Sequence, residues 1–154
     1  FKSVKRRMEV RGTENGITVI DDFAHHPTAV EETLRALRMK YTGRRLVAVF
    51  EPRSWSSRLA VFQEHYSKAF SYADYVIIAG VYNTAKASEL GKVLDVSELV
   101  ERIALQGKPS YSFPDADSIV THLVPELREG DVVAIMSNGG FGGIHSKILD
   151  RIKK

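Results

Sequence analysis

Three short, uninterrupted apolar runs constrain the fold of this chain more than any other feature. They are Leu46–Phe50, Tyr75–Ala79 and Val132–Met136. Strands that are apolar along their whole length are buried on both faces, as in parallel sheets. The segments between them repeat apolar residues at helical spacing, and parallel strands need such crossovers. The pattern therefore predicts an α/β fold, a Rossmann-like three-layer sandwich around a mostly parallel sheet.

The rest of the chain supplies the predicted helices and two further strand regions. Asn15-Gly16 is a hairpin-turn signal, so residues 8–11 and 16–21 are predicted to form an N-terminal antiparallel hairpin. Residues 109–113 are predicted to add a short strand. Helices are predicted from the apolar spacing at Val30, Leu34 and Leu37; at Leu59, Phe62, Tyr66 and Phe70; at Leu99, Ile103 and Ala104; at Ile119, Val120 and Leu123; and at Ile144, Ile148, Leu149 and Ile152.

The size and composition indicate one ordinary soluble domain. The chain has 154 residues, of which 44% are apolar and 27% are charged. Residues 8–154 are predicted to form the domain. Residues 1–7, which include no initiator Met, are predicted to be the remnant of an interdomain linker in a longer polypeptide.

The composition also limits the function classes. Cysteine is absent, which excludes a disulfide framework, a thiolate metal site and a cysteine nucleophile. No apolar run approaches the ~20 residues of a membrane span, and no basic-aromatic array indicates RNA or DNA binding. We therefore expect a cytoplasmic protein with neither a membrane nor a nucleic-acid partner. The net charge of +3 suits a phosphate-bearing ligand.

A dense polar cluster at residues 21–26 lies between a predicted strand and a predicted helix, and contains two acids and two histidines. Pro27 suits the first helical position, where its missing N–H is no loss. Ligands of open α/β sheets bind at the carboxyl ends of strands, so the cluster predicts a site. The alternative is that the acids start a turn and that His26 caps the helix. The paired histidines lack the usual spacing of zinc ligands, so no metal site is predicted.

Two further loops follow predicted strands and reach the same edge of the sheet. Residues 51–58 carry Arg53 and Arg58, which can grip a carboxylate or phosphate in a forked geometry, although Arg58 can instead lie on a solvated helix face. The glycine-rich residues 137–143 let backbone amides approach a ligand, although glycines also permit tight helix–sheet packing. This loop is neither a Rossmann fingerprint nor a P-loop. No catalytic residue is predicted, and the edge is interpreted as one that holds ligands.

Together these segments resemble the Mur ligase family. The resemblance rests on Asp21-Asp22-Phe23-Ala24-His25-His26-Pro27-Thr28-Ala29, on Glu51-Pro52-Arg53-Ser54, and on Met136-Ser137-Asn138-Gly139-Gly140-Phe141-Gly142-Gly143-Ile144-His145. It runs in order along the whole chain and corresponds to the family's C-terminal domain. The family's central domain, with its P-loop and catalytic lysine, and its UDP-sugar N-terminal domain are not in this sequence.

The resemblance implies an ADP-forming amide ligase that uses ATP and Mg²⁺, with the metal held mainly by the central domain. The first motif alone also fits the member that adds L-alanine to UDP-N-acetylmuramate. The glycine loop points to the member that joins UDP-N-acetylmuramate to the tripeptide L-alanyl-γ-D-glutamyl-meso-diaminopimelate in cell-wall recycling. ATP phosphorylates the sugar carboxylate, and the peptide amine then attacks the acyl phosphate. The C-terminal domain binds the peptide and closes over ATP, and by itself is expected to be inactive.

The resemblance also implies roles for single residues. Nucleotide binding falls to Arg7, which matches an arginine that reaches the phosphates, to Asp22, which matches an acid on the ribose hydroxyls, and to His25. Substrate binding falls to His26, Arg53, Arg58, Ser137, Asn138, Gly139, Gly140 and Phe141.

Two uncertainties follow from the same comparison with the family pattern. Residues 55–58 read Trp-Ser-Ser-Arg where the family often has an Asn-Thr-Met-Arg-like segment, which leaves the role of Arg58 open, like that of His26. The alternatives to the tripeptide ligase are the L-alanine-adding ligase and a stand-alone Rossmann-like module that binds a nucleotide or a peptide.

Overall fold

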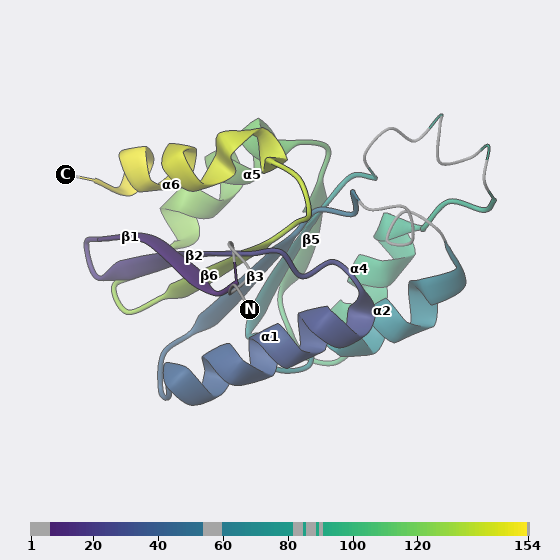
Figure 1. The fold of residues 1–154 in the computed structure, drawn as a ribbon, viewed down its shortest axis with the longest axis horizontal. Helices are drawn as coiled ribbons and strands as arrows, with labels where there is room; N and C mark the ends of the chain where they lie inside the picture. Colours follow the sequence, from purple (N-terminus) through teal and green to yellow (C-terminus); the bar gives the residue numbers. More distant parts are fainter. Residues whose placement is uncertain (1–6, 54–59, 82–84, 86–88, 90, 154) are drawn as a thin grey trace, which may run out of the picture.

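A six-stranded sheet between two layers of helices forms the fold (Figure 1). The computed structural model describes residues 7–53, 60–81, 85, 89 and 91–153. The strands are β1 (Glu9–Glu14), β2 (Ile17–Asp22), β3 (Leu46–Phe50), β4 (Tyr75–Ala79), β5 (Ser110–Phe113) and β6 (Val132–Met136), in the spatial order β1-β2-β6-β3-β4-β5. β1 is antiparallel to β2 and the other neighbours are parallel, so the predicted fold class is confirmed.

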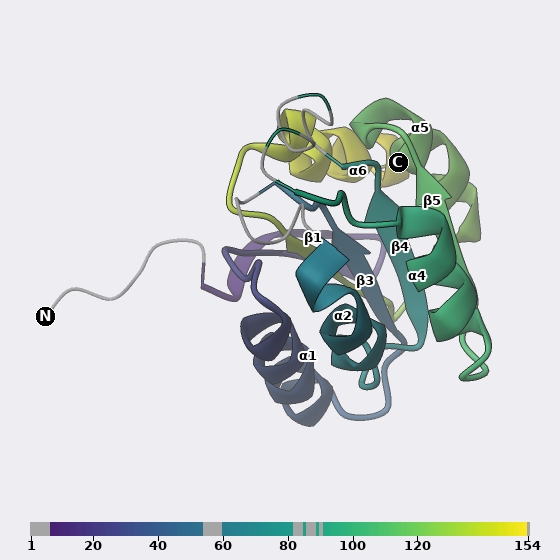
Figure 2. The same cartoon turned by 90° about the vertical axis from the view of Figure 1, so that its right-hand side faces the viewer.

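Helices cover both faces of the sheet, with α1 and α2 on one side and α5 and α6 on the other in Figure 2. The main helices are α1 (Pro27–Lys40), α2 (Gln63–Ala69), α4 (Val96–Ala104), α5 (Ala116–Leu123) and α6 (Ile144–Ile152), and the short 3-10 helices are η2 (Ala60–Phe62), η3 (Val124–Glu126) and η4 (Phe141–Gly143). α1, α2 and α4 pack on one face, and α5 and α6 on the other. In β3, Phe50 belongs to the first core and Val49 to the second, which explains why a central strand must be apolar at every position.

The N-terminal hairpin is longer than predicted. β1 continues to Glu14, so the turn consists of Asn15 and Gly16 alone, with φ values of 51° and 75° as a tight hairpin turn requires. A register shift between Val10 and Gly12 interrupts the pairing with β2. Most β1 side chains are exposed, so this edge strand lacks the apolar signal from which its end could have been predicted. The predicted helical position at Leu59 lies outside the described residues.

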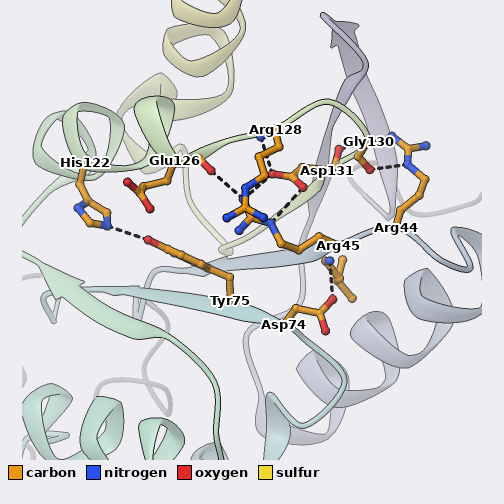
Figure 3. Close-up of polar contacts among 10 residues, drawn as sticks. Arg44, Arg45, Asp74, Tyr75, His122, Glu126, Arg128, Gly130 and Asp131 are labelled. Carbon is orange, nitrogen blue, oxygen red and sulfur yellow. Dashed lines mark hydrogen bonds and ion pairs between the residues drawn. The ribbon is translucent and has the colours of Figure 1, made fainter.

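The edge where the parallel strands begin is held by ion pairs and hydrogen bonds, drawn in Figure 3. Arg45 forms a forked pair with the buried Asp131, with Nη2–Oδ2 at 2.6 Å and Nε–Oδ1 at 3.1 Å. The Tyr75 hydroxyl lies 2.8 Å from Nε2 of His122, and burial raises the pKa of Tyr75 to about 12. These polar groups therefore satisfy one another, and the predicted site residues lie at the opposite edge.

Candidate ligand-binding edge

The first part of the candidate site is built around Asp22, the last residue of β2. Its side chain is buried, and it accepts hydrogen bonds from the backbone N–H groups of Met8 and Ala24, each at 2.8 Å. The hydroxyl of Thr33 donates to the same carboxylate at 3.2 Å. Asp22 therefore fixes the segment before β1 and the loop before α1 in one arrangement.

A pocket of about 270 Å³ opens beside this carboxylate. Its lining consists of Arg7, Met8, Asp22, Phe23, Ala24, His25, Ala29, Glu32, Thr33 and Ala36. The structure thus brings together all three residues that were predicted to bind a nucleotide, Arg7, Asp22 and His25. Small apolar side chains beside a cation and an acid suit a ligand with both a flat ring and a charged group. The volume is just below the range of about 300–1,000 Å³ typical of small-molecule sites, and suits part of such a ligand.

The two histidines occupy different environments. His25 is half-buried at the pocket, and its Nδ1 lies 2.9 Å from the carbonyl oxygen of Phe23. His26 is the exposed residue before α1, makes no side-chain cap bond, and places its ring 4.9 Å from that of Phe62 in an edge-on contact. His26 does not line the pocket. Among the residues that the structure describes, no group of three or more His, Cys, Asp or Glu side chains is arranged to hold a metal ion.

The second part of the candidate site joins the loops after β3 and β6. The hydroxyl of the buried Ser137 donates to Oε1 of Glu51 at 2.6 Å and accepts from the N–H of Gly139 at 3.0 Å. Arg53 lies directly against Gly139, since a Cβ added to this glycine would be 2.0 Å from Cδ of Arg53. The predicted residues Arg53, Ser137 and Gly139 therefore lie together, with Ser137 wholly buried beneath the loop, and the structure adds Glu51 to them.

The remaining residues of the glycine loop have separate roles. Oδ1 of Asn138 is buried and has no hydrogen-bond partner in the described part of the chain. Phe141 is 2% exposed and packs into the core under α5 and α6, so only its backbone can meet a ligand. Phe141, Gly142 and Gly143 have φ values of 50°, 59° and 69°, a left-handed run that glycine adopts without strain at the last two positions. Gly140 is exposed, with open space around it. Arg58 lies outside the described residues.

A buried pair fixes the start of α6 behind the glycine loop. Nε2 of His145 lies 2.9 Å from Oδ1 of Asp21, and both side chains are almost wholly buried. Arg11 approaches the other oxygen of Asp21 at 3.7 Å. Asp21 and Asp22 are adjacent in a strand and point to opposite faces of the sheet. Asp21 therefore holds the start of α6 behind the glycine loop, and Asp22 holds the segments that line the pocket.

Sequence reasoning missed Glu51 as a functional candidate and did not foresee the pairing of Asp21 with His145. Glu51 carried a signal, because an acid directly after a buried strand falls at the ligand-binding edge. Its contact with Ser137 joins residues 86 positions apart, and only the β3–β6 pairing brings them together.

Comparison with known proteins identifies the class to which this fold and site belong. The sequence profile described as "Mur ligase, glutamate ligase domain" matches residues 6–139. The chain belongs to the Mur ligase family and corresponds to its C-terminal domain. The curated relatives include a UDP-N-acetylmuramate–L-alanyl-γ-D-glutamyl-meso-2,6-diaminoheptandioate ligase of Escherichia coli K12, which is 39% identical over 155 residues, 100% of this chain and 32% of the relative.

The chain is also similar to a second curated relative and to a solved structure of the same family. A UDP-N-acetylmuramate–L-alanine ligase of Caldanaerobacter subterraneus is 35% identical over 154 residues, 100% of this chain and 33% of the relative. The crystal structure of a murein peptide ligase from Psychrobacter arcticus 273-4 matches with a TM-score of 0.82 at 32% identity, covering 99% of this chain and 31% of that one. The chain thus spans about a third of the length of the curated relatives it matches. None of its described helices is long and apolar enough to cross a membrane.

Proposed function

We propose that this chain is the part of a peptide-adding Mur ligase that binds the incoming peptide and closes over ATP. The reaction joins UDP-N-acetylmuramate to L-alanyl-γ-D-glutamyl-meso-diaminopimelate. The observation that supports this most is the presence of two different binding surfaces at one edge of the sheet. They are directly joined, because the N–H of Ser137 donates to the backbone oxygen of Asp22 at 3.2 Å.

The pocket side fits a nucleotide. Arg7 offers a cation for phosphate, and the apolar wall at Ala29 and Ala36 suits a purine ring. A carboxylate has about four acceptor positions, of which Asp22 uses three within the chain, so one remains for a ribose hydroxyl. ATP, when bound, supplies the phosphoryl group that activates the sugar carboxylate. We assign Mg²⁺ mainly to the family's central domain, as the resemblance implies.

The loops after β3 and β6 fit the peptide. Arg53 supplies a guanidinium that can take a peptide carboxylate in a forked geometry. The backbone at Gly140, which is exposed and has open space around it, can supply an N–H donor without a side chain in the way. In this arrangement the chain orients the peptide amine for attack and contributes no catalytic residue of its own.

The L-alanine-adding ligase is the second candidate, because relatives with that name reach 35% identity over this whole chain. The two candidates differ in the substrate that drives turnover. We expect the full-length protein to release phosphate from ATP and UDP-N-acetylmuramate when the tripeptide is added, and far less with L-alanine. A preference for L-alanine would establish the second candidate, and no turnover with either would favour a module that only binds nucleotide or peptide.

A further inference from the structure

Both ends of the glycine loop, residues 138–143, are attached to the last two residues of β2. At the first end, the N–H of Ser137 donates to the backbone oxygen of Asp22 at 3.2 Å. At the second end, Nε2 of His145 donates to Oδ1 of Asp21 at 2.9 Å. The position of the loop is therefore set by two hydrogen bonds to one strand end, one from the backbone and one from a side chain.

α6 begins without a side-chain cap. Its N-cap is Gly143, which has a left-handed φ of 69° and makes no side-chain cap bond. Phe141 is also left-handed, with a φ of 50°, a conformation that a bulky residue adopts only where its surroundings impose it. His145 follows directly, buried in the first turn of α6. Its bond to Asp21 therefore takes the place of a cap in fixing where α6 starts.

Packing alone does not require a polar pair at this position. The neighbouring α6 residues Ile144 and Ile148 fill the second core with apolar side chains. A buried polar pair adds little stability over apolar side chains of the same volume, but a hydrogen bond allows only a narrow range of geometries. We propose that His145 is a positioning residue. Through Asp21 it holds the exposed backbone at Gly140 in place for the incoming peptide, without touching the peptide itself.

The inference rests on the proposed function, in which the glycine loop meets the peptide, and names a residue outside that loop. His145 does not line the pocket beside Asp22. Loss of its bond should therefore weaken the binding of the peptide and leave the binding of ATP nearly unchanged. A residue that only supports the fold would instead lower the melting temperature and change neither Michaelis constant.

The test compares three variants of the full-length ligase. His145→Phe keeps a buried ring and removes the N–H, whereas His145→Gln keeps an N–H at about the reach of Nε2. Ile148→Val is the matched control, because it weakens the packing of the same helix and leaves the pair intact. The KM for the tripeptide should rise by about tenfold or more in His145→Phe, by less than about threefold in His145→Gln, and not at all in Ile148→Val. The KM for ATP should stay within about twofold in all three.

Amide hydrogen exchange tests the loop without any substrate. The N–H groups of Gly139 and Gly143 donate within the chain at 3.0 and 3.1 Å. They should exchange about tenfold faster in His145→Phe, and at the wild-type rate in His145→Gln and Ile148→Val. If His145→Phe does not fold, Asp21→Asn decides instead. It replaces the charged acceptor of the same bond by a neutral one, and should raise the tripeptide KM by about threefold or more.

Failure of the inference is distinguishable from failure of the proposed function. An unchanged tripeptide KM in His145→Phe, or an equal rise in Ile148→Val, would overturn the inference and leave the proposed function intact. A wild-type protein that uses L-alanine and not the tripeptide would overturn the proposed function, and the same variants would then decide the inference through the KM for L-alanine. A wild-type protein that uses neither substrate would overturn both.

Discussion

The carboxylate of Asp22 stabilises the fold and, in our proposal, also binds a ligand. Three hydrogen bonds hold it against Met8, Ala24 and Thr33, so that it both shapes the pocket and lines it. Met8 has a φ of 47°, a left-handed conformation that its bond to Asp22 helps to maintain. A substitution of Asp22 therefore changes both its contact with a ligand and the position of the loops that it holds. The control variant must separate these two effects.

Asp22→Ala is expected to weaken ATP use more than peptide use. Loss of a charged hydrogen bond corresponds to about a ten- to hundredfold rise in the KM for ATP, because the ribose acceptor is lost and Met8 is released. Thr33→Val removes one internal donor and keeps the carboxylate, so its effect on the KM for ATP should be small. Steady-state kinetics of the full-length ligase measure both. A rise confined to the peptide KM would move Asp22 to the other binding surface.

Gly139→Ala is expected to impair peptide binding, because the added Cβ would lie 2.0 Å from Cδ of Arg53 and would displace that side chain. The KM for the tripeptide should rise by about tenfold or more, while the KM for ATP should stay nearly constant. Gly80→Ala is the matched control, since its Cβ would make an ordinary contact of 3.4 Å with Pro114. An unchanged peptide KM in Gly139→Ala would separate Arg53 from peptide binding.

At the scale of elements, α6 carries one buried hydrogen-bonded pair, His145 with Asp21, and one exposed ion pair, Lys147 with Asp117, which allows a direct comparison. His145→Ala removes the ring nitrogen that lies 2.9 Å from the buried Asp21, and should lower the free energy of unfolding by about 2 kcal/mol, as expected for loss of one partner of a buried hydrogen bond. Lys147→Ala breaks a contact with Asp117 in which both side chains are well exposed, and should cost less than about 1 kcal/mol. Urea denaturation measures both values. Equal losses would show that the buried pair contributes no more than the exposed one.

Tyr75, at the edge where the parallel strands begin, is expected to make the free energy of unfolding depend on pH. Burial raises the pKa of Tyr75 to about 12, so the folded state keeps a proton that the unfolded chain loses near its ordinary pKa of about 10. The contribution of Tyr75 to stability is therefore complete below about pH 10 and is lost as the pH rises from there towards about 12. Tyr75→Phe should make the decline in unfolding free energy over this range shallower. An identical slope would assign the decline to other groups.

At the scale of the whole molecule, the two cores on either side of one sheet favour cooperative folding of the chain by itself. We expect a single melting transition by circular dichroism for the 154-residue chain, and no ligase turnover in a phosphate-release assay, since its sequence contains no P-loop. Purified, robust turnover would overturn the proposed division of roles between this chain and the rest of the protein. A molten or aggregated product would contradict the expectation of independent folding.

The order and type of the central elements were determined by the sequence alone. Leu46–Phe50, Tyr75–Ala79 and Val132–Met136 are strands with the predicted bounds, because a strand buried on both faces is apolar at every position. The motifs at residues 21–29, 51–54 and 136–145 were enough to predict the family. The end of β1 was not predicted, because an exposed edge strand is polar and carries no such pattern.

Only the tertiary structure decided which loop residues meet one another. It set Asp22 against Met8, Glu51 against Ser137 and Asp21 against His145, residues up to 124 positions apart in the sequence. Such contacts follow from the strand order β1-β2-β6-β3-β4-β5. In this order β6 lies between β2 and β3, although it is the last of the strands along the chain. Local sequence patterns record the period and burial of each element but not which elements become neighbours, because that choice depends on packing of the whole chain.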